Sequence, residues 1–115
     1  MGTNNQTDAS LLAKASDIAA LVDYQSSSVV SRTIIDRSAG SVTLFAFDQG
    51  QGLSEHTAPF DALVQIIDGE AVITIDGHSI NVKSGQMTIM PANRPHALKA
   101  NTKFKMMLVM IRGIE

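Results

Sequence analysis

The sequence predicts an all-β fold, a barrel or sandwich preceded by a short N-terminal helix. From Val29 onward, runs rich in apolar and β-branched residues recur about every 8–12 residues. Turn residues separate these runs, including the dipeptides Asp68-Gly69 and Asp76-Gly77, which favour tight hairpins. No helical spacing appears after residue 28, so a parallel α/β fold, which needs a helix between successive strands, is excluded.

Only the N-terminal part has the spacing of a helix. From Leu11 to Val22 the apolar residues recur with helical periodicity, and Ser16 stands before Asp17 as a candidate cap. A chain of 115 residues suits one core. We therefore divide it into a tail and short helix over residues 1–28 and one barrel domain over residues 29–115.

The barrel domain is predicted to contain eight strands joined mainly by tight turns. Asp68-Gly69 is expected to close one hairpin and Asp76-Gly77 a second. The predicted strands are residues 29–35, 42–47, 63–67, 71–75, 79–82, 86–90, 96–100 and 104–112.

The composition and net charge indicate which binding partners and which cellular location to expect. A net charge of −2 gives no electrostatic reason to expect a nucleic-acid partner. No apolar stretch reaches the roughly 18 residues that a membrane span needs, so no membrane association is expected. The first residues lack the basic start and apolar core of a signal peptide, and cysteine is absent. We expect a cytoplasmic protein.

His56 and His96 are the first candidate site residues. Each adjoins an irregular, proline-containing segment, and we place each where a strand begins. Neutral imidazole is a common metal ligand, but two histidines fall short of the three or four protein ligands of a secure zinc site. From spacing alone, the two residues form either a joint metal site or a hydrogen-bonded pair in a pocket. His78 follows the second Asp-Gly turn and is expected to be a solvated hairpin residue.

Two spaced motifs carry a family resemblance. The first runs from Gly50 through His56 to Gly69, and the second runs from Gly85 through Pro91 to His96. Over residues 42–110 this pattern resembles the cupin superfamily, and within it the small single-domain conserved-barrel proteins of unassigned reaction. The resemblance implies a double-stranded β-helix, or jelly-roll, barrel.

The resemblance also implies a metal site that this chain carries only in part. In complete cupins three His and one Glu bind iron, manganese, nickel or zinc. Here His56 and His96 match, whereas the second His falls on Ala58 and the Glu falls on Ala62. We therefore expect His56 and His96 either to orient a small-molecule ligand or to hold a weakly bound divalent metal (Zn, Fe, Mn or Ni). The carboxylate of Glu55 or Asp61 could join them only if the backbone reorients it.

Strand alternation predicts which residues face the interior. If His96 points inward, Leu98 and Ala100 follow it, and if Ala62 points inward, Val64 and Ile66 do so too. The result is an apolar interior with two imidazoles, which suits a small-molecule pocket and an ordinary core equally. We also assign ligand contacts to Met90 and Arg94. The C-terminal methionines either pack the core or line an adaptable pocket, and Arg94 either pairs an acidic ligand or is solvated.

We interpret the chain as a small-molecule-binding cupin barrel. The alternatives are a metal-dependent cupin enzyme of the dioxygenase, isomerase or decarboxylase type, and a non-catalytic sensor or assembly barrel. The last strand is apolar on both faces, so one face needs a cover. We expect a homodimer through the Val29–Ile35 strand, as small cupins often form.

Overall fold

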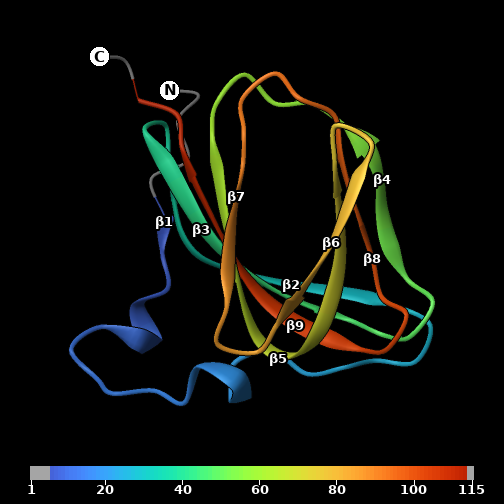
Figure 1. The fold of residues 1–115 in the computed structure, drawn as a ribbon. Helices are drawn as coiled ribbons and strands as arrows, with labels where there is room; N and C mark the ends of the chain where they lie inside the picture. The colour runs from blue at the N-terminus through green and yellow to red at the C-terminus, as the bar shows by residue number, and fades with distance from the viewer. Residues whose placement is uncertain (1–5, 114–115) are drawn as a thin grey trace.

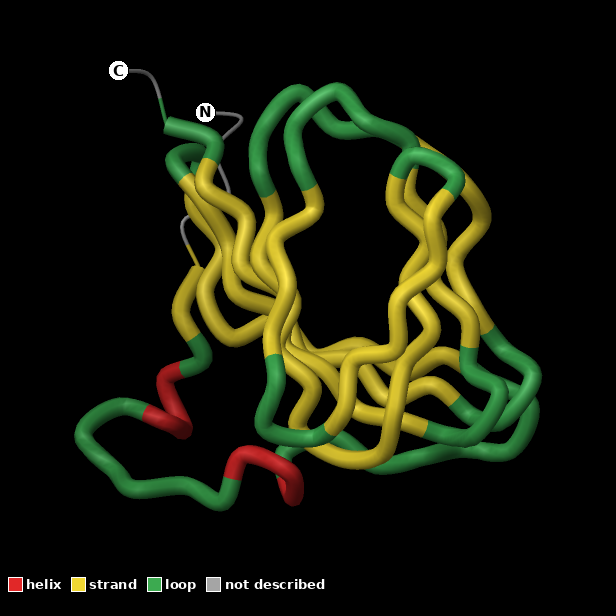
Figure 2. The backbone as a smooth tube through the Cα atoms, in the orientation of Figure 1, coloured by secondary structure: helices red, strands yellow, loops and turns green. Residues whose placement is uncertain are grey.

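Two antiparallel sheets face each other (Figures 1 and 2), and the buried side chains between them form an apolar core. The computed structural model describes residues 6–113, and the prediction of an all-β fold is confirmed. Within that range the strands are β1 Gln6–Thr7, β2 Val29–Arg37, β3 Gly40–Phe47, β4 Gly52–His56, β5 Ala62–Ile75, β6 His78–Lys83, β7 Met87–Met90, β8 His96–Lys99 and β9 Phe104–Ile111.

The long strand β5 belongs to both sheets. Its first half pairs with β7 and β9, in the sheet that continues through β3 and β2 to β1. Its second half pairs with β6 and β8, and β8 pairs in turn with β4. A register shift between Ile66 and Asp68 marks the change from one sheet to the other. The hydrogen-bonded order of the strands is open, because it does not return on itself.

The hairpin predicted at Asp68-Gly69 is wrong. These residues lie inside β5, and Gly69 has a positive φ of 77° at the irregularity that bends the strand. A side chain at Gly69 would collide with the backbone carbonyl of Lys103, so the close approach of the β9 entry explains the glycine. The second dipeptide does form a hairpin between β5 and β6, with φ of 54° at Asp76 and 83° at Gly77.

The N-terminal helix predicted within residues 11–22 is wrong. The segment contains only two 3-10 turns, η1 Ala9–Leu11 and η2 Ile18–Ala20. Lys105 donates through Nζ to the carbonyl of Ala19, and Arg32 donates to the carbonyl of Leu21. The helix is instead broken at Ala13, whose positive φ of 56° does not fit a right-handed helix. Within the described residues, no helix has the length and apolarity to cross a membrane.

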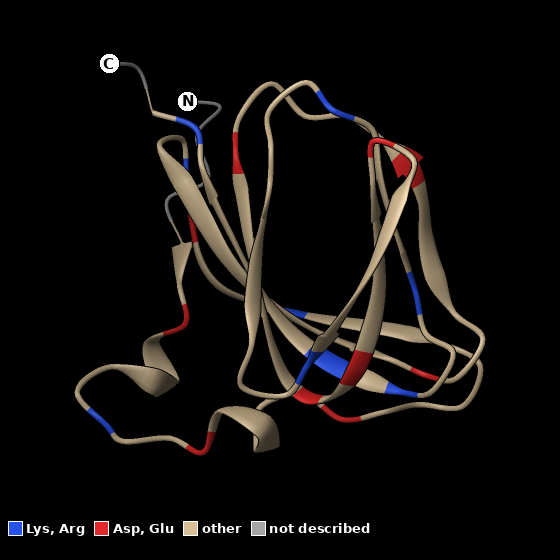
Figure 3. Ribbon diagram, in the orientation of Figure 1, with Lys and Arg blue, Asp and Glu red and all other residues tan. Residues whose placement is uncertain are grey.

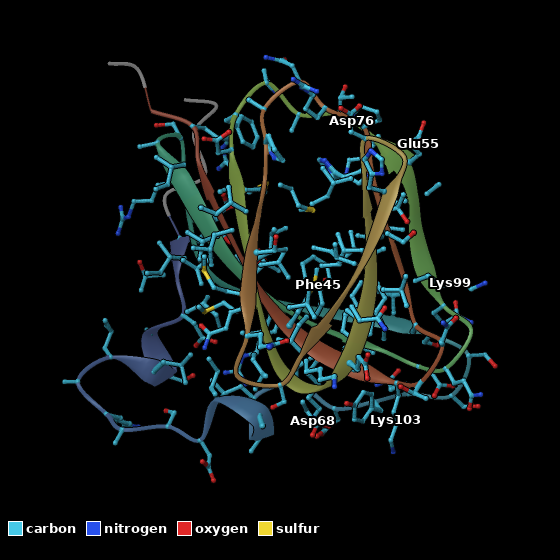
Figure 4. The ribbon with its side chains drawn as sticks, viewed as in Figure 1. Phe45, Glu55, Asp68, Asp76, Lys99 and Lys103 are labelled. Carbon is cyan, nitrogen blue, oxygen red and sulfur yellow. The ribbon has the colours of Figure 1, made fainter. Side chains whose placement is uncertain are left out.

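The core lies between the sheets and includes two stacked rings at the Phe104 end of β9. The rings of Phe47 and Phe104 stack with their centroids 4.5 Å apart, and both residues are fully buried. Phe45 also points into this space (Figure 4). The outer face of the larger sheet has a second cluster, in which Val22 packs near Leu44 and Ala46. The N-terminal segment therefore covers part of that face instead of forming a helix.

Candidate functional site

The two histidines meet at one end of the smaller sheet. His56 is the last residue of β4 and His96 the first of β8, and antiparallel pairing places them opposite each other. His56 was expected to stand where a strand begins, and this is wrong because it ends β4. That strand escaped prediction because Leu53 is its one large apolar residue and a bulge between Leu53 and His56 breaks its alternation.

The two imidazole rings contact each other directly. Nε2 of His56 lies 3.1 Å from Nε2 of His96, and the ring planes meet at 73°. Each Nδ1 faces a backbone carbonyl two residues earlier in the chain, at 2.7 Å from Ser54 O for His56 and 3.2 Å from Arg94 O for His96. Both rings are therefore oriented by the backbone, and their Nε2 atoms converge.

The three contacts of the two rings need one proton more than two neutral imidazoles carry. Two Nδ1···O contacts and one Nε2···Nε2 contact need three protons, whereas two neutral imidazoles carry two. A proton or another cation between the Nε2 atoms would satisfy all three contacts. Burial lowers the pKa of His96, and the neighbouring His56 lowers it further. The neutral form of His96 is therefore favoured, and neutral imidazole is the form that binds a metal ion.

The pair forms the polar end of a small apolar cavity. The cavity has a volume of about 120 Å³, which is room for about four waters at the volume that each takes in the liquid. His96 is buried, and His56 is more exposed at the rim. The lining residues are Leu53, His56, Ala58, Ala62, Met90, His96, Leu98, Met106, Leu108 and Met110.

Four of the seven residues assigned to ligand binding line this cavity together: His56, His96, Leu98 and Met90. Val64 and Ile66 are fully buried on the interior face of β5 but lie deeper, outside the cavity lining. Arg94 is exposed and forms an ion pair with Asp76 at the β5–β6 turn. The structure thus places Arg94 at the rim, engaged with another group.

The two carboxylates considered as extra metal ligands lie away from the cavity. Glu55 is exposed on β4 (Figure 4). Asp61 accepts a hydrogen bond from the backbone N–H of Ala92 at 2.8 Å, which holds the loop before β5. Among residues 6–113, no group of three or more His, Cys, Asp or Glu side chains comes together as a metal site.

Sequence reasoning did not assign several lining residues. Leu108 and Met110 come from β9, and Met106 lies on the same interior face of that strand. Their signal was present, because residues 104, 106, 108 and 110 alternate inward in a strand that is apolar on both faces. Ala58 and Ala62 also line the cavity, so their small side chains leave the space in which it forms.

Residues 43–112 match the family model described as a cupin domain. The chain belongs to the cupin family. Similar solved structures include a conserved protein of unknown function from Streptococcus pyogenes, with 37% identity, a TM-score of 0.86, and coverage of 98% of this chain and 96% of that one. A cupin superfamily protein from Desulfitobacterium hafniense has 28% identity and a TM-score of 0.83, over 88% of this chain and 93% of that one.

A more distant likeness shows the fold alone. Salicylate 1,2-dioxygenase from Pseudoaminobacter salicylatoxidans has 13% identity and a TM-score of 0.67, over 72% of this cupin and 26% of the dioxygenase chain. No curated protein matches the sequence. The comparisons therefore establish the cupin fold. The Streptococcus pyogenes protein, which matches nearly the whole of this chain, is of unknown function.

Proposed function

We propose that this cupin binds a small molecule in the cavity, with the His56–His96 pair as its polar anchor. A cation at the point where the two Nε2 atoms converge would link the pair to the ligand. The convergence at 3.1 Å, with both Nδ1 atoms held by carbonyls, supports this function most directly. Histidines that bind a metal ion are held in the same way, because their second ring nitrogen donates to a backbone carbonyl or a carboxylate.

The shape of the cavity supports a ligand of only a few non-hydrogen atoms. Its volume of about 120 Å³ is well below the roughly 300–1,000 Å³ of sites for drug-sized molecules. Its walls are apolar apart from the two imidazoles, which is the usual composition of a small-molecule site. A small anion or neutral molecule could contact the cation while the walls exclude water.

The divalent metal that the family pattern implies fits this chain only in part. His56 and His96 supply two neutral nitrogens, but Ala58 and Ala62 supply no donor at the two remaining positions. A divalent ion would therefore depend on water or ligand oxygen for most of its coordination, and its binding would be weak. The complete set of four protein ligands is not available here.

The test is binding of Zn²⁺ to the metal-free protein, measured with and without acetate as a small anion that could contact the bound ion. We expect Zn²⁺ to raise the melting temperature, because an ion that binds only the native state stabilises it. The double variant His56→Ala/His96→Ala should show no rise, whereas the control His78→Ala should respond as the wild type does. The proposal fails if the wild type shows no shift, or if the double variant shows the same shift.

We also propose that the cupin forms a homodimer through Val29–Ile35. These residues lie in β2, and within the described part of the chain this strand pairs with β1 only at Ile35 and Asp36. The outer edge of such a strand presents backbone N–H and C=O groups that a second copy can pair. Light scattering at micromolar concentration should give the mass of two chains, and a monomeric mass would overturn the proposal.

A further inference from the structure

Methionine side chains flank the position where the cupin pattern would place its carboxylate ligand. Ala62 occupies that position on β5 and lies directly opposite Met90 on β7 and Met110 on β9. The three residues form one row across the larger sheet, and all three line the cavity that contains the histidine pair. The chain has thus lost a hard oxygen donor at a place bordered by two thioethers.

This row can bring sulfur to the imidazole pair. Cβ atoms of directly opposite residues in neighbouring antiparallel strands lie about 4.5–5.5 Å apart. Methionine is unbranched and has three rotatable bonds, so its sulfur can move over the methyl group of Ala62. The cavity between the row and the two rings has a volume of only about 120 Å³. Residues that carry both kinds of donor therefore line the same small space.

The donor set determines which ion is favoured. Thioether sulfur is a soft ligand that favours Cu(I), and imidazole suits copper as well as zinc, iron and nickel, whereas carboxylate and water suit Mn²⁺ and other hard ions. No Asp or Glu lines the cavity, and the chain has no cysteine to supply a thiolate. The strand β7, which contributes Met90, carries no charged residue (Figure 3). The site therefore combines soft thioether sulfur and two imidazoles with apolar walls.

We propose that the pair binds Cu(I), with the two Nε2 atoms and the thioether of Met90 or Met110 as ligands. This rests on the proposed function, because it needs the His56–His96 pair to be a cation site. Two nitrogens 3.1 Å apart, each about 2.0 Å from one ion, subtend about 100° at that ion. This angle leaves one side of the ion open, so a sulfur from the opposite sheet completes a three- or four-coordinate site.

Met106 provides a matched control within the same cavity. It lies opposite Ile66, two inward positions further along β5 than Ala62, and is fully buried. It lines the same cavity but is not part of the row at Ala62. Replacement of methionine by leucine conserves volume, so the variants should fold with little loss of stability.

The experiment is an anaerobic titration with Cu(I) in competition with a chromophoric cuprous chelator. We expect one Cu(I) per chain in the wild type and in Met106→Leu. In Met90→Leu/Met110→Leu, Cu(I) affinity should fall at least about tenfold while Zn²⁺ affinity changes little, because thioether sulfur contributes mainly to the soft ion. X-ray absorption should show a sulfur neighbour of copper in the wild type that is missing in the double methionine variant.

Each contrary result has a distinct meaning. If the double methionine variant binds Cu(I) as the wild type does, or if wild-type copper has no sulfur neighbour, the thioether assignment is overturned. If the wild type takes up Zn²⁺ through the histidines but no Cu(I), the copper proposal is overturned and the proposed function stands. If His56→Ala/His96→Ala retains wild-type affinity for both ions, the proposed function is overturned as well.

Discussion

The interior of this cupin has a filled half and a hollow half, although the same strands cross both. Along β9, Phe104 and Met106 are fully buried, whereas Leu108 and Met110, which line the cavity together with Met106, are only partly buried. At the filled half, β3 and β9 bring Phe47 against Phe104. At the hollow half, the facing positions on β5 and its preceding loop carry Ala62 and Ala58.

The difference shows how side-chain volume creates a site within a uniform scaffold. Strand pairing continues across both halves, so the backbone does not account for the cavity. Large rings fill the space between the sheets at one end, and alanines leave it open at the other. Among the described residues, the only two imidazoles that point inward lie in the hollow half.

The largest expected effect is in the filled half. Phe104→Ala removes a fully buried ring stacked on Phe47 and should lower the free energy of unfolding by about 3–5 kcal/mol. Met110→Ala on the same strand should cost less, because its side chain borders space that is already open. Urea unfolding followed by circular dichroism measures both. Equal losses would remove the distinction between the two halves.

A carboxylate in the hollow half should exchange stability for metal affinity. Ala62→Glu places an acid in a site where Ala62 is 3% exposed, which should destabilise the metal-free protein by about 1–3 kcal/mol. Zn²⁺ should restore this loss by using the new oxygen with the two histidines. Ala62→Gln is the control, since it fills the same space without a charge. Equal rescue of both variants by Zn²⁺ would contradict the expectation.

Acid should weaken the hollow half through His96. Burial, with His56 as the second cause, lowers the pKa of His96 below its usual value of about 6.5. The unfolded chain therefore binds more protons at mildly acidic pH, so stability is full above about pH 6.5 and falls as pH drops towards the folded pKa. Urea midpoints in chelator-containing buffer between pH 8 and pH 5 measure this. His96→Gln should show a shallower decline, and an identical decline would exclude His96 as its source.

The smallest expected effect is at the rim. Arg94→Ala breaks an exposed ion pair with Asp76, and such pairs contribute about 0–1 kcal/mol. Cation binding at the histidine pair should not change, because Arg94 lies outside the cavity lining. The same Zn²⁺ melting experiment checks this. A loss of the Zn²⁺ response in Arg94→Ala would show that Arg94 belongs to the cation site, so the site would extend beyond the hollow half.

Part of the site could be predicted from residues alone. Alternation correctly placed Val64, Ile66 and Leu98 on inward faces. It did not reveal Met110 as a neighbour of Ala62, because 48 positions along the chain separate them and only the β5–β9 register brings them together. The helix expected within residues 11–22 failed for a related reason. That segment contacts distant residues such as Lys105, which donates to the carbonyl of Ala19, and its residue Ala13 has a positive φ of 56°.

The sequence by itself determined the class of fold and the two histidines. Period-2 alternation, the Asp76-Gly77 turn and the spaced glycine motifs are local patterns, and local backbone preferences act on them directly. Only the tertiary structure determined that β5 runs unbroken through Asp68-Gly69, that the two Nε2 atoms converge, and that thioethers border the vacated ligand position. These features depend on strand register and on contacts between distant segments, which no local pattern specifies.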